Sequence, residues 1–237
     1  MNNLAQPTTL PVIGFVTGLT AEARLLNKSG FLVEAGGGLP DGAYRAAERL
    51  IGQGAQALVS FGLAGGLAPG MAPGRLLVPS FVVEGEERYP CDPALITFLG
   101  GSNGAKIFAG AEIAATVAQK AALYRTTRIG AVDLESGAVA RVARLHDVPF
   151  AVLRAIADPA TRTLPPAALV PLKPWGAIDL PRILRSVMAN PAQIPALIGL
   201  ARDAGKARAA LVAQVRTLTR GGRKASFCEQ KEAKKLC

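Results

Sequence analysis

The sequence is poor in the residues that several kinds of active site require. It has one histidine, His146, and three cysteines, Cys91, Cys228 and Cys237, which lack metal-ligand spacing. A Ser-His-Asp triad or a histidine-rich metal site would have to use His146, which we interpret as a capping or surface residue at a helix end. Three cysteines are too few for a disulfide framework. We therefore expect no metal site and a reducing compartment.

Long apolar runs are also missing. No stretch approaches the roughly 18 uninterrupted apolar residues of a membrane span, and no basic segment precedes the short apolar run at residues 10–19. Half of the 237 residues are nevertheless apolar and only 19% are charged, which excludes a disordered chain because such a composition can bury a core. We expect a cytoplasmic protein.

The positive charge is concentrated near the C-terminus. Residues 182–237 hold 12 Lys and Arg against 3 Asp and Glu, whereas residues 1–181 hold 15 against 14. A net charge of +10 suits a nucleic-acid-binding protein, but aromatic residues are only 5% of the chain and none is interleaved with the basic ones. We therefore expect no nucleic-acid partner. The basic segment is either a contact with an anionic membrane or a solvated tail.

Short β-rich runs alternate with alanine-rich segments, which is the pattern of βαβ units and a mostly parallel sheet. We predict one domain over residues 1–218 and a basic, flexible tail at 219–237. A proline-rich lid or connection follows residue 158. The predicted strands are 12–17, 31–35, 57–61, 76–83, 106–109, 129–133 and 150–156, and the predicted helices are 21–28, 41–52, 113–124, 135–146 and 195–218.

Three acidic residues, Glu22, Glu135 and Asp158, follow predicted strands. The carboxyl ends of strands in an open parallel sheet form the ligand crevice, so these acids can converge there. Taken singly, Glu22 and Glu135 fit equally well as charges that compensate a helix N-terminus. Two glycine-rich turns, at 36–38 and 62–66, also follow strands and would let the backbone approach a sugar or an anion. Neither turn matches the dinucleotide-binding or P-loop pattern.

Five short segments then occur in a recognisable order. They are VTGLTAE at 16–22, GLAGGL at 62–67, RY at 88–89, AVDLE at 131–135 and RAIAD at 154–158. This order resembles the purine nucleoside phosphorylase and methylthioadenosine nucleosidase superfamily, and within it the hopanoid-associated phosphorylase branch, which is linked to removal of adenine from adenosylhopane. The resemblance implies a single-domain three-layer α/β/α fold with a mostly parallel mixed central sheet, a homo-oligomer and no cofactor.

The resemblance also assigns roles to residues. Asp158 matches the acid that protonates or hydrogen-bonds N7 of the departing purine, Glu135 the glutamate that holds the ribose hydroxyls, and Glu22 the acid that positions the attacking water. The other substrate-binding residues that it implies are Ala64, Gly65, Gly66, Tyr89, Gly110, Ile113 and Leu134.

The chemistry of glycosidic cleavage agrees with these roles. The sugar gains positive charge and the purine gains negative charge, so an acid is needed near the base and carboxylates near the sugar. The apolar run at 150–153 before Asp158 predicts a buried strand end that raises the pKa of this acid.

The chain departs from the family pattern at four places. Leu134 replaces a methionine, Ala157 replaces the serine before the catalytic aspartate, and a Pro-Cys pair at 90–91 replaces His-Asp. The turn at residue 62 also lacks the arginine and serine that commonly bind phosphate. Inorganic phosphate, held by backbone amides with Arg24, Arg45 or Arg75, therefore stays an alternative to water as the nucleophile.

The substrate has two interpretations. We expect release of adenine from a lipid-linked nucleoside, and the alternative is a soluble nucleosidase or phosphorylase that acts on methylthioadenosine or another small purine nucleoside. A lipid-linked substrate predicts an enzyme peripheral to the inner face of the membrane. The predicted contacts are the basic C-terminal segment and the loop residues Leu172, Pro174 and Trp175.

Overall fold

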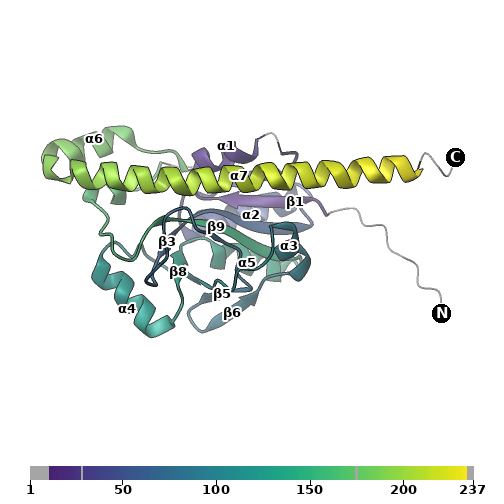
Figure 1. The fold of residues 1–237 in the computed structure, drawn as a ribbon, viewed down its shortest axis with the longest axis horizontal. Coiled ribbons are helices and arrows are strands. Elements are labelled where there is room, and N and C mark those ends of the chain that lie inside the picture. The colour runs from purple at the N-terminus through teal and green to yellow at the C-terminus, as the bar shows by residue number, and fades with distance from the viewer. Residues whose placement is uncertain (1–10, 28, 174–175, 234–237) are drawn as a thin grey trace.

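The computed structural model describes residues 11–27, 29–173 and 176–233. Strands and helices alternate along most of this length (Figure 1). The strands are β1 Ile13–Thr17, β2 Leu32–Ala35, β3 Ala57–Gly66, β4 Leu76–Leu77, β5 Phe81–Glu84, β6 Glu87–Pro90, β7 Ile107–Ala109, β8 Ala131–Asp133 and β9 Phe150–Asp158. The α-helices are α1 Thr20–Leu26, α2 Pro40–Gly52, α3 Pro93–Phe98, α4 Val117–Thr127, α5 Ser136–Leu145, α6 Leu180–Ala189 and α7 Ile194–Ala233, and the 3-10 helices include η1 Pro166–Leu169 and η3 Pro191–Gln193.

The described strands form one mixed sheet. Its order is β2-β1-β3-β8-β7-β5-β6, and β9 lies beside β3 and β4. The pairs β1–β2, β1–β3, β3–β9, β5–β7 and β7–β8 are parallel, whereas β3–β8, β4–β9 and β5–β6 are antiparallel. The predicted mostly parallel mixed sheet is confirmed.

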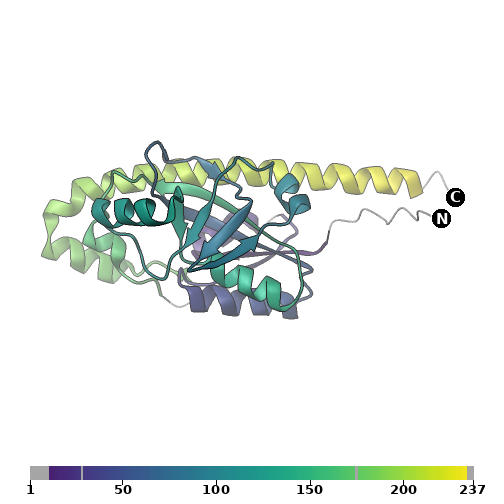
Figure 2. The same cartoon turned by 90° about the horizontal axis from the view of Figure 1, so that it is seen from below.

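Helices cover both faces of this sheet. The helices α2 and α5 lie side by side on one face, and the long helix α7 packs on β9 from the other, next to α1 (Figures 1 and 2). Strand β9 is buried along its whole length, so its apolar residues form the centre of the core. The three-layer α/β/α architecture is therefore confirmed.

Two strand predictions differ from the structure. Residues 62–66 are the end of β3 rather than a turn, because Gly65 and Gly66 pair with Val132 and Ala131 of β8. The predicted strand 76–83 is divided into β4 and β5 around Pro79, which has no backbone N–H to donate to a neighbouring strand. Strand β6, with its pairing to β5, was not predicted.

The helix predictions differ mainly at their ends. Helix α4 begins at Val117 rather than residue 113, because Thr116 and Gln119 form a capping box there. Helix α7 continues to Ala233 instead of ending at residue 218, and its added residues are mostly Ala, Arg, Lys, Glu and Gln, which favour helix. Helices α3 and α6 were not predicted.

His146 follows the last turn of α5, and its Nε2 lies 3.0 Å from Oε2 of Glu48. This position confirms a helix-end residue at the surface. No helix within the described ranges is long and apolar enough to cross a membrane, and the same ranges hold no group of three or more potential metal ligands.

Candidate active site

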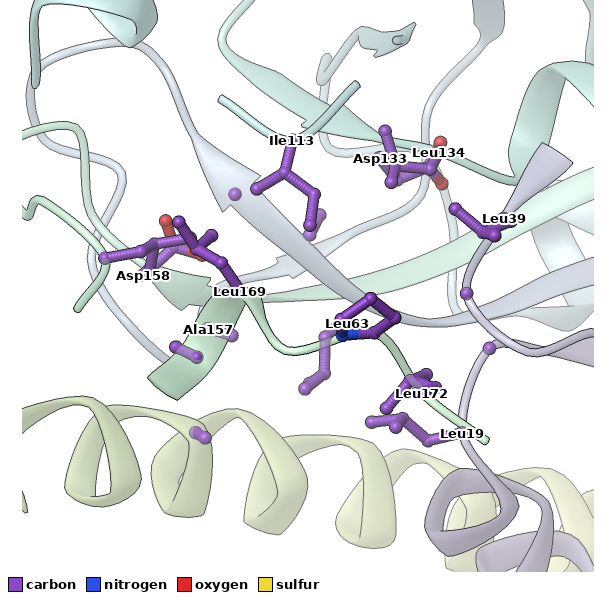
Figure 3. A pocket seen from close by; sticks show the side chains of 18 of the residues that line it. Leu19, Leu39, Leu63, Ile113, Asp133, Leu134, Ala157, Asp158, Leu169 and Leu172 are labelled. Carbon is purple, nitrogen blue, oxygen red and sulfur yellow. The ribbon is translucent and has the colours of Figure 1, made fainter. Parts of the chain in front are cut away.

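The candidate site lies where β3, β8 and β9 end. A bulge between Ala64 and Gly65 lets Gly65 pair with Asp158 at the ends of two parallel strands. The cavity there has a volume of about 630 Å³, within the range of small-molecule sites. Figure 3 shows Asp158 on one side of it and Leu134 on the other, with Leu63 and Ile113 between them. The predicted convergence of strand ends therefore forms a cavity.

A buried arginine organises one side of the cavity. The guanidinium of Arg154, on β9, is 1% exposed, and its Nε and Nη2 lie 2.8 Å from Oδ2 of Asp133 and Oε2 of Glu135. Nη2 also donates to Oγ of Ser60 at 2.6 Å, and Nη1 donates to the carbonyl of Leu63 at 3.3 Å. Arg154 is thus held by partners on three sides and is not free to bind a phosphate.

Glu22 lies beside this cluster in the first turn of α1. Its Oε2 accepts hydrogen bonds from the amides of Gly18 and Leu19 at 3.1 and 2.9 Å, and its Oε1 accepts from the amide of Leu63 at 3.0 Å. Burial and the nearby Glu135 charge raise the pKa of Glu22 to about 7, against the opposing effect of Arg154. Such a carboxyl can exchange a proton near neutral pH, as a base for water must.

Glu135 precedes α5 and lines the same cavity. Burial raises its pKa, and Arg154 opposes that rise. Its Oε1 is buried and accepts no well-formed hydrogen bond from the described residues, which leaves it available to a ribose hydroxyl. A Cβ at Gly18 would lie 2.5 Å from this oxygen, so glycine is required for the approach.

A second glycine has a similar role behind the cluster. Gly62 has a φ of 148°, and a Cβ there would lie 2.7 Å from Oε1 of Glu22 and 2.8 Å from Nη1 of Arg154. Gly62, from one of the two predicted glycine-rich turns, therefore makes room for the buried charges of the site, whereas Gly37, Gly38 and Gly65 of these turns line the cavity.

Asp158 lies across the cavity from Leu134 and has a buried cationic partner. Nζ of Lys120, on α4, contacts Oδ2 of Asp158 and donates to the carbonyls of Pro159 and Arg162 at 3.0 and 2.9 Å. Burial raises the pKa of Asp158, as the sequence predicted, and Lys120 partly offsets this rise. The Lys120 side chain is 0% exposed.

The rest of the cavity is an apolar wall built by the chain that follows Asp158. The wall consists of Leu164, Ala167, Ala168, Leu169, Val170, Pro171, Leu172, Ile178, Ile183, Leu200 and Ala204, from η1, α6, α7 and the segments between them. Asp179 is the one charged residue among the described residues of this stretch that line the cavity. The predicted lid or connection is therefore a wall of the site.

The structure brings most of the predicted site residues to the cavity, namely Glu22, Ala64, Gly65, Ile113, Leu134, Glu135 and Asp158. It does not bring Gly66, Tyr89 or Gly110 there. Tyr89 is buried in the core, where the guanidinium of Arg144 lies 4.8 Å from its ring centroid. Arg24, Arg45 and Arg75, considered above as phosphate ligands, are exposed and lie outside the lining.

Sequence reasoning missed two of the charged residues that shape the site. Arg154 interrupts an apolar strand, and a charge in such a run must be paired when it is buried, so a signal was present. Lys120 lies in an alanine-rich helix, where a lysine is typical of a solvent-exposed face. Nothing in its sequence surroundings distinguishes it.

Comparison with models of known protein families shows which family the chain belongs to. The model of the phosphorylase superfamily matches residues 7–94 and 85–169, together more than half of the sequence. The chain therefore belongs to the phosphorylase superfamily, and the prediction of an enzyme from this superfamily is confirmed. No curated protein sequence gives a significant match.

Several solved structures share the fold. An S-adenosylhomocysteine nucleosidase from Streptococcus pyogenes, in complex with 5-methylthiotubericidin, gives a TM-score of 0.62 at 17% identity over 90% of this chain and 99% of its own. The 5′-methylthioadenosine/S-adenosylhomocysteine nucleosidase of S. pneumoniae gives a TM-score of 0.61 at 14% identity, over 87% of this chain and 99% of its own. The futalosine hydrolase of Helicobacter pylori gives a TM-score of 0.61 at 17% identity, over 86% of this chain and 97% of its own.

The position of Glu135 predicts a sugar-dependent effect. Glu135→Gln should lower kcat/KM for an adenine ribonucleoside by about 10²-fold, because a carboxylate bound to the ribose hydroxyls stabilises the cationic sugar. The 2′-deoxyribosyl analogue should lose much less. Adenine release from both substrates, measured side by side, checks this, and equal losses would contradict the contact.

The raised pKa of Glu22 predicts the pH dependence of the reaction. Glu22 must be ionised to accept a proton from water, so kcat/KM should rise as the pH increases through about 7. Glu22→Gln should abolish this rise and lower the rate by about 10² or more. The exposed Glu86→Gln is the matched control. A pH–rate profile of adenine release measures the effect, and a rise that persists in Glu22→Gln would disprove the assignment.

Proposed function

We propose that this protein hydrolyses the N-glycosidic bond of a purine nucleoside whose sugar carries a large apolar substituent, and that it releases adenine from adenosylhopane in hopanoid biosynthesis. The observation that carries the proposal is the combination of a carboxylate-lined sugar side with an apolar wall in one cavity. Solved relatives of the same fold are nucleosidases by name, one of them in complex with a nucleoside analogue. The reaction needs no cofactor.

The proposed roles follow the charges of the site. The C1′–N9 bond breaks with its electron pair passing to the purine, and Asp158 gives a proton to N7. Glu135 binds the ribose hydroxyls and stabilises the positive charge on the sugar. Water adds to C1′ and gives its proton to Glu22.

Two observations favour water over phosphate. Arg154 is the one basic residue among the described residues that line the cavity. Its guanidinium already pairs with the carboxylates of Asp133 and Glu135. Asp133, Glu135 and, once ionised, Glu22 would repel an anionic nucleophile, whereas they stabilise a cationic sugar. A neutral nucleophile fits these charges.

The apolar wall favours a bulky substituent over a small one. The wall lies in the same cavity as the ribose-binding residues, so a substituent on the sugar contacts it directly. The alternative, a soluble nucleosidase or phosphorylase acting on methylthioadenosine or a similar small nucleoside, leaves most of that apolar surface unfilled. Burial of apolar area is the main source of affinity for an apolar group, which supports the lipid-linked substrate.

A membrane contact accompanies this proposal. Six large apolar side chains on and around α6 and the start of α7 are exposed, namely Ile178, Leu180, Leu184, Met188, Ile194 and Ile198. These helices form one end of the molecule (Figure 1), and Asp179 is the only acid in residues 171–202, against four basic residues. We propose that this surface and the basic C-terminal segment dock on an anionic cytoplasmic membrane.

This surface differs from the predicted insertion loop. Leu172 lines the cavity and is half-buried, so it belongs to the wall, while Pro174 and Trp175 lie outside the described residues. The exposed helices are therefore an apolar contact proposed in addition to Pro174 and Trp175, for which the contact stays a prediction. A second copy of the chain as occupant would place like charges against each other at a two-fold interface.

Mass spectrometry of the products tests the substrate and the nucleophile together. Adenosylhopane in detergent should yield adenine and a sugar that carries one ¹⁸O from labelled water, at the same rate with or without phosphate. Ile183→Asn should lower kcat/KM for adenosylhopane by about tenfold, because it places a polar group in the wall, and should leave 5′-methylthioadenosine unaffected. A ribosyl 1-phosphate product, with no turnover in phosphate-free buffer, would make the protein a phosphorylase. Preference for 5′-methylthioadenosine would support the small-nucleoside alternative.

Co-sedimentation with vesicles tests the membrane contact. The full-length protein should bind vesicles containing phosphatidylglycerol at low salt, and binding should weaken at least about tenfold for Leu184→Asp with Met188→Asp. Leu145→Asp is the matched control, because Leu145 is 66% exposed on α5. A chain ending at Gly221 should bind more weakly and with less salt sensitivity. Full-length protein that ignores these vesicles would refute the docking but not the chemistry.

A further inference from the structure

The pairing of Lys120 with Asp158 calls for an explanation beyond packing. Lys120 occupies the first turns of α4, where the helix dipole disfavours a cation. Its ammonium group is fully buried, which is costly unless it is paired. Its three N–H donors meet three acceptors: the Asp158 carboxylate and the carbonyls of Pro159 and Arg162. This complete set of partners matches the charged form of lysine.

We infer that Lys120 is a positioning residue that orients the carboxyl of Asp158 and sets the pH range in which this acid works. The position before Asp158 is Ala157, which has no hydroxyl to hold the carboxyl. Lys120 reaches Asp158 from α4, a different part of the chain, and fixes Oδ2. This inference rests on the proposed role of Asp158 as the acid at N7.

The pairing also favours the proton transfer itself. Before the reaction, Asp158 carries the proton and Lys120 is an ammonium. When the proton moves to N7 of the leaving purine, Asp158 becomes a carboxylate, and its contact with Lys120 becomes an ion pair. Lys120 therefore stabilises the charge that Asp158 acquires, and solvent supplies the next proton.

The other charged groups that face Asp158 largely cancel. Arg162, which follows β9, and Asp203, on α7, both act on Asp158 and form an ion pair with each other at 2.6 Å. Nζ of Lys206 lies 3.6 Å from the other oxygen of Asp203. Lys120 is consequently the cation that contacts the Asp158 carboxyl. Its removal takes away the largest effect that opposes burial and leaves only the smaller effect of Arg162, so the pKa of Asp158 rises.

The test compares the pH profiles of wild type, Lys120→Met and Lys120→Arg. Because Asp158 acts as an acid, kcat/KM falls as the pH rises and Asp158 loses its proton. In Lys120→Met this falling limb should move up by about 1 to 3 pH units, since an opposite charge in contact shifts the pKa of a carboxyl by this amount. The limb that Glu22 sets should stay near 7. Maximal adenine release should fall about 10- to 100-fold, less than for Asp158→Asn, and Lys120→Arg should restore both the profile and the rate.

A substrate that needs no acid separates this role from a structural one. Departure of 4-nitrophenolate from 4-nitrophenyl riboside needs no proton, so Lys120→Met should cleave it at nearly the wild-type rate. Equal losses on both substrates, with an unmoved pH profile, would overturn the inference. If Lys120→Met fails to fold, Lys120→Gln replaces it, because its amide can still donate to the two carbonyls. Wild-type protein that releases no adenine would instead refute the proposed function.

Discussion

The buried guanidinium of Arg154 is the interaction on which the rest of the site depends. It stands on the central strand β9 and is removed from water, so the carboxylates around it are needed to keep it charged and paired. Those carboxylates come from β8 and from the start of α5, with Glu22 of α1 close by. One cation thereby fixes side chains from separate parts of the chain in a single arrangement. The carboxylates outnumber the single guanidinium of Arg154, and the resulting excess of negative charge suits the cationic sugar of the proposed reaction.

The site divides its two cations between two tasks. Arg154 pairs with Asp133 and Glu135, whereas Lys120 pairs with Asp158. The polarity of glycosidic cleavage requires this separation, because positive charge develops on the sugar and negative charge on the base. In the proposed reaction, each end of the cavity thus has a local electrostatic environment that suits the fragment assigned to it.

The fold class and the three acids were predictable from the sequence because both depend on local patterns. Alternating strands and helices indicate a parallel sheet, and Glu22, Glu135 and Asp158 each follow a strand whose end faces the cavity. Partners across the fold were not predictable. Lys120 lies 38 positions from Asp158, and no local pattern in the sequence links the two residues. The wall was missed because prolines mask helical periodicity after residue 158, although they do not prevent α6 from forming.

The position of the apolar wall along the chain has an evolutionary consequence. All the charged groups assigned to bond cleavage lie within the residues that match the superfamily model, 7–169, whereas much of the wall comes from residues 170–204. Reactivity and selectivity are therefore encoded in consecutive stretches of the gene. Mutations of the apolar wall residues in the later stretch can reshape the compartment proposed for the sugar substituent without replacing a proton-transfer group, so new substrates can be acquired while the inherited chemistry stays intact.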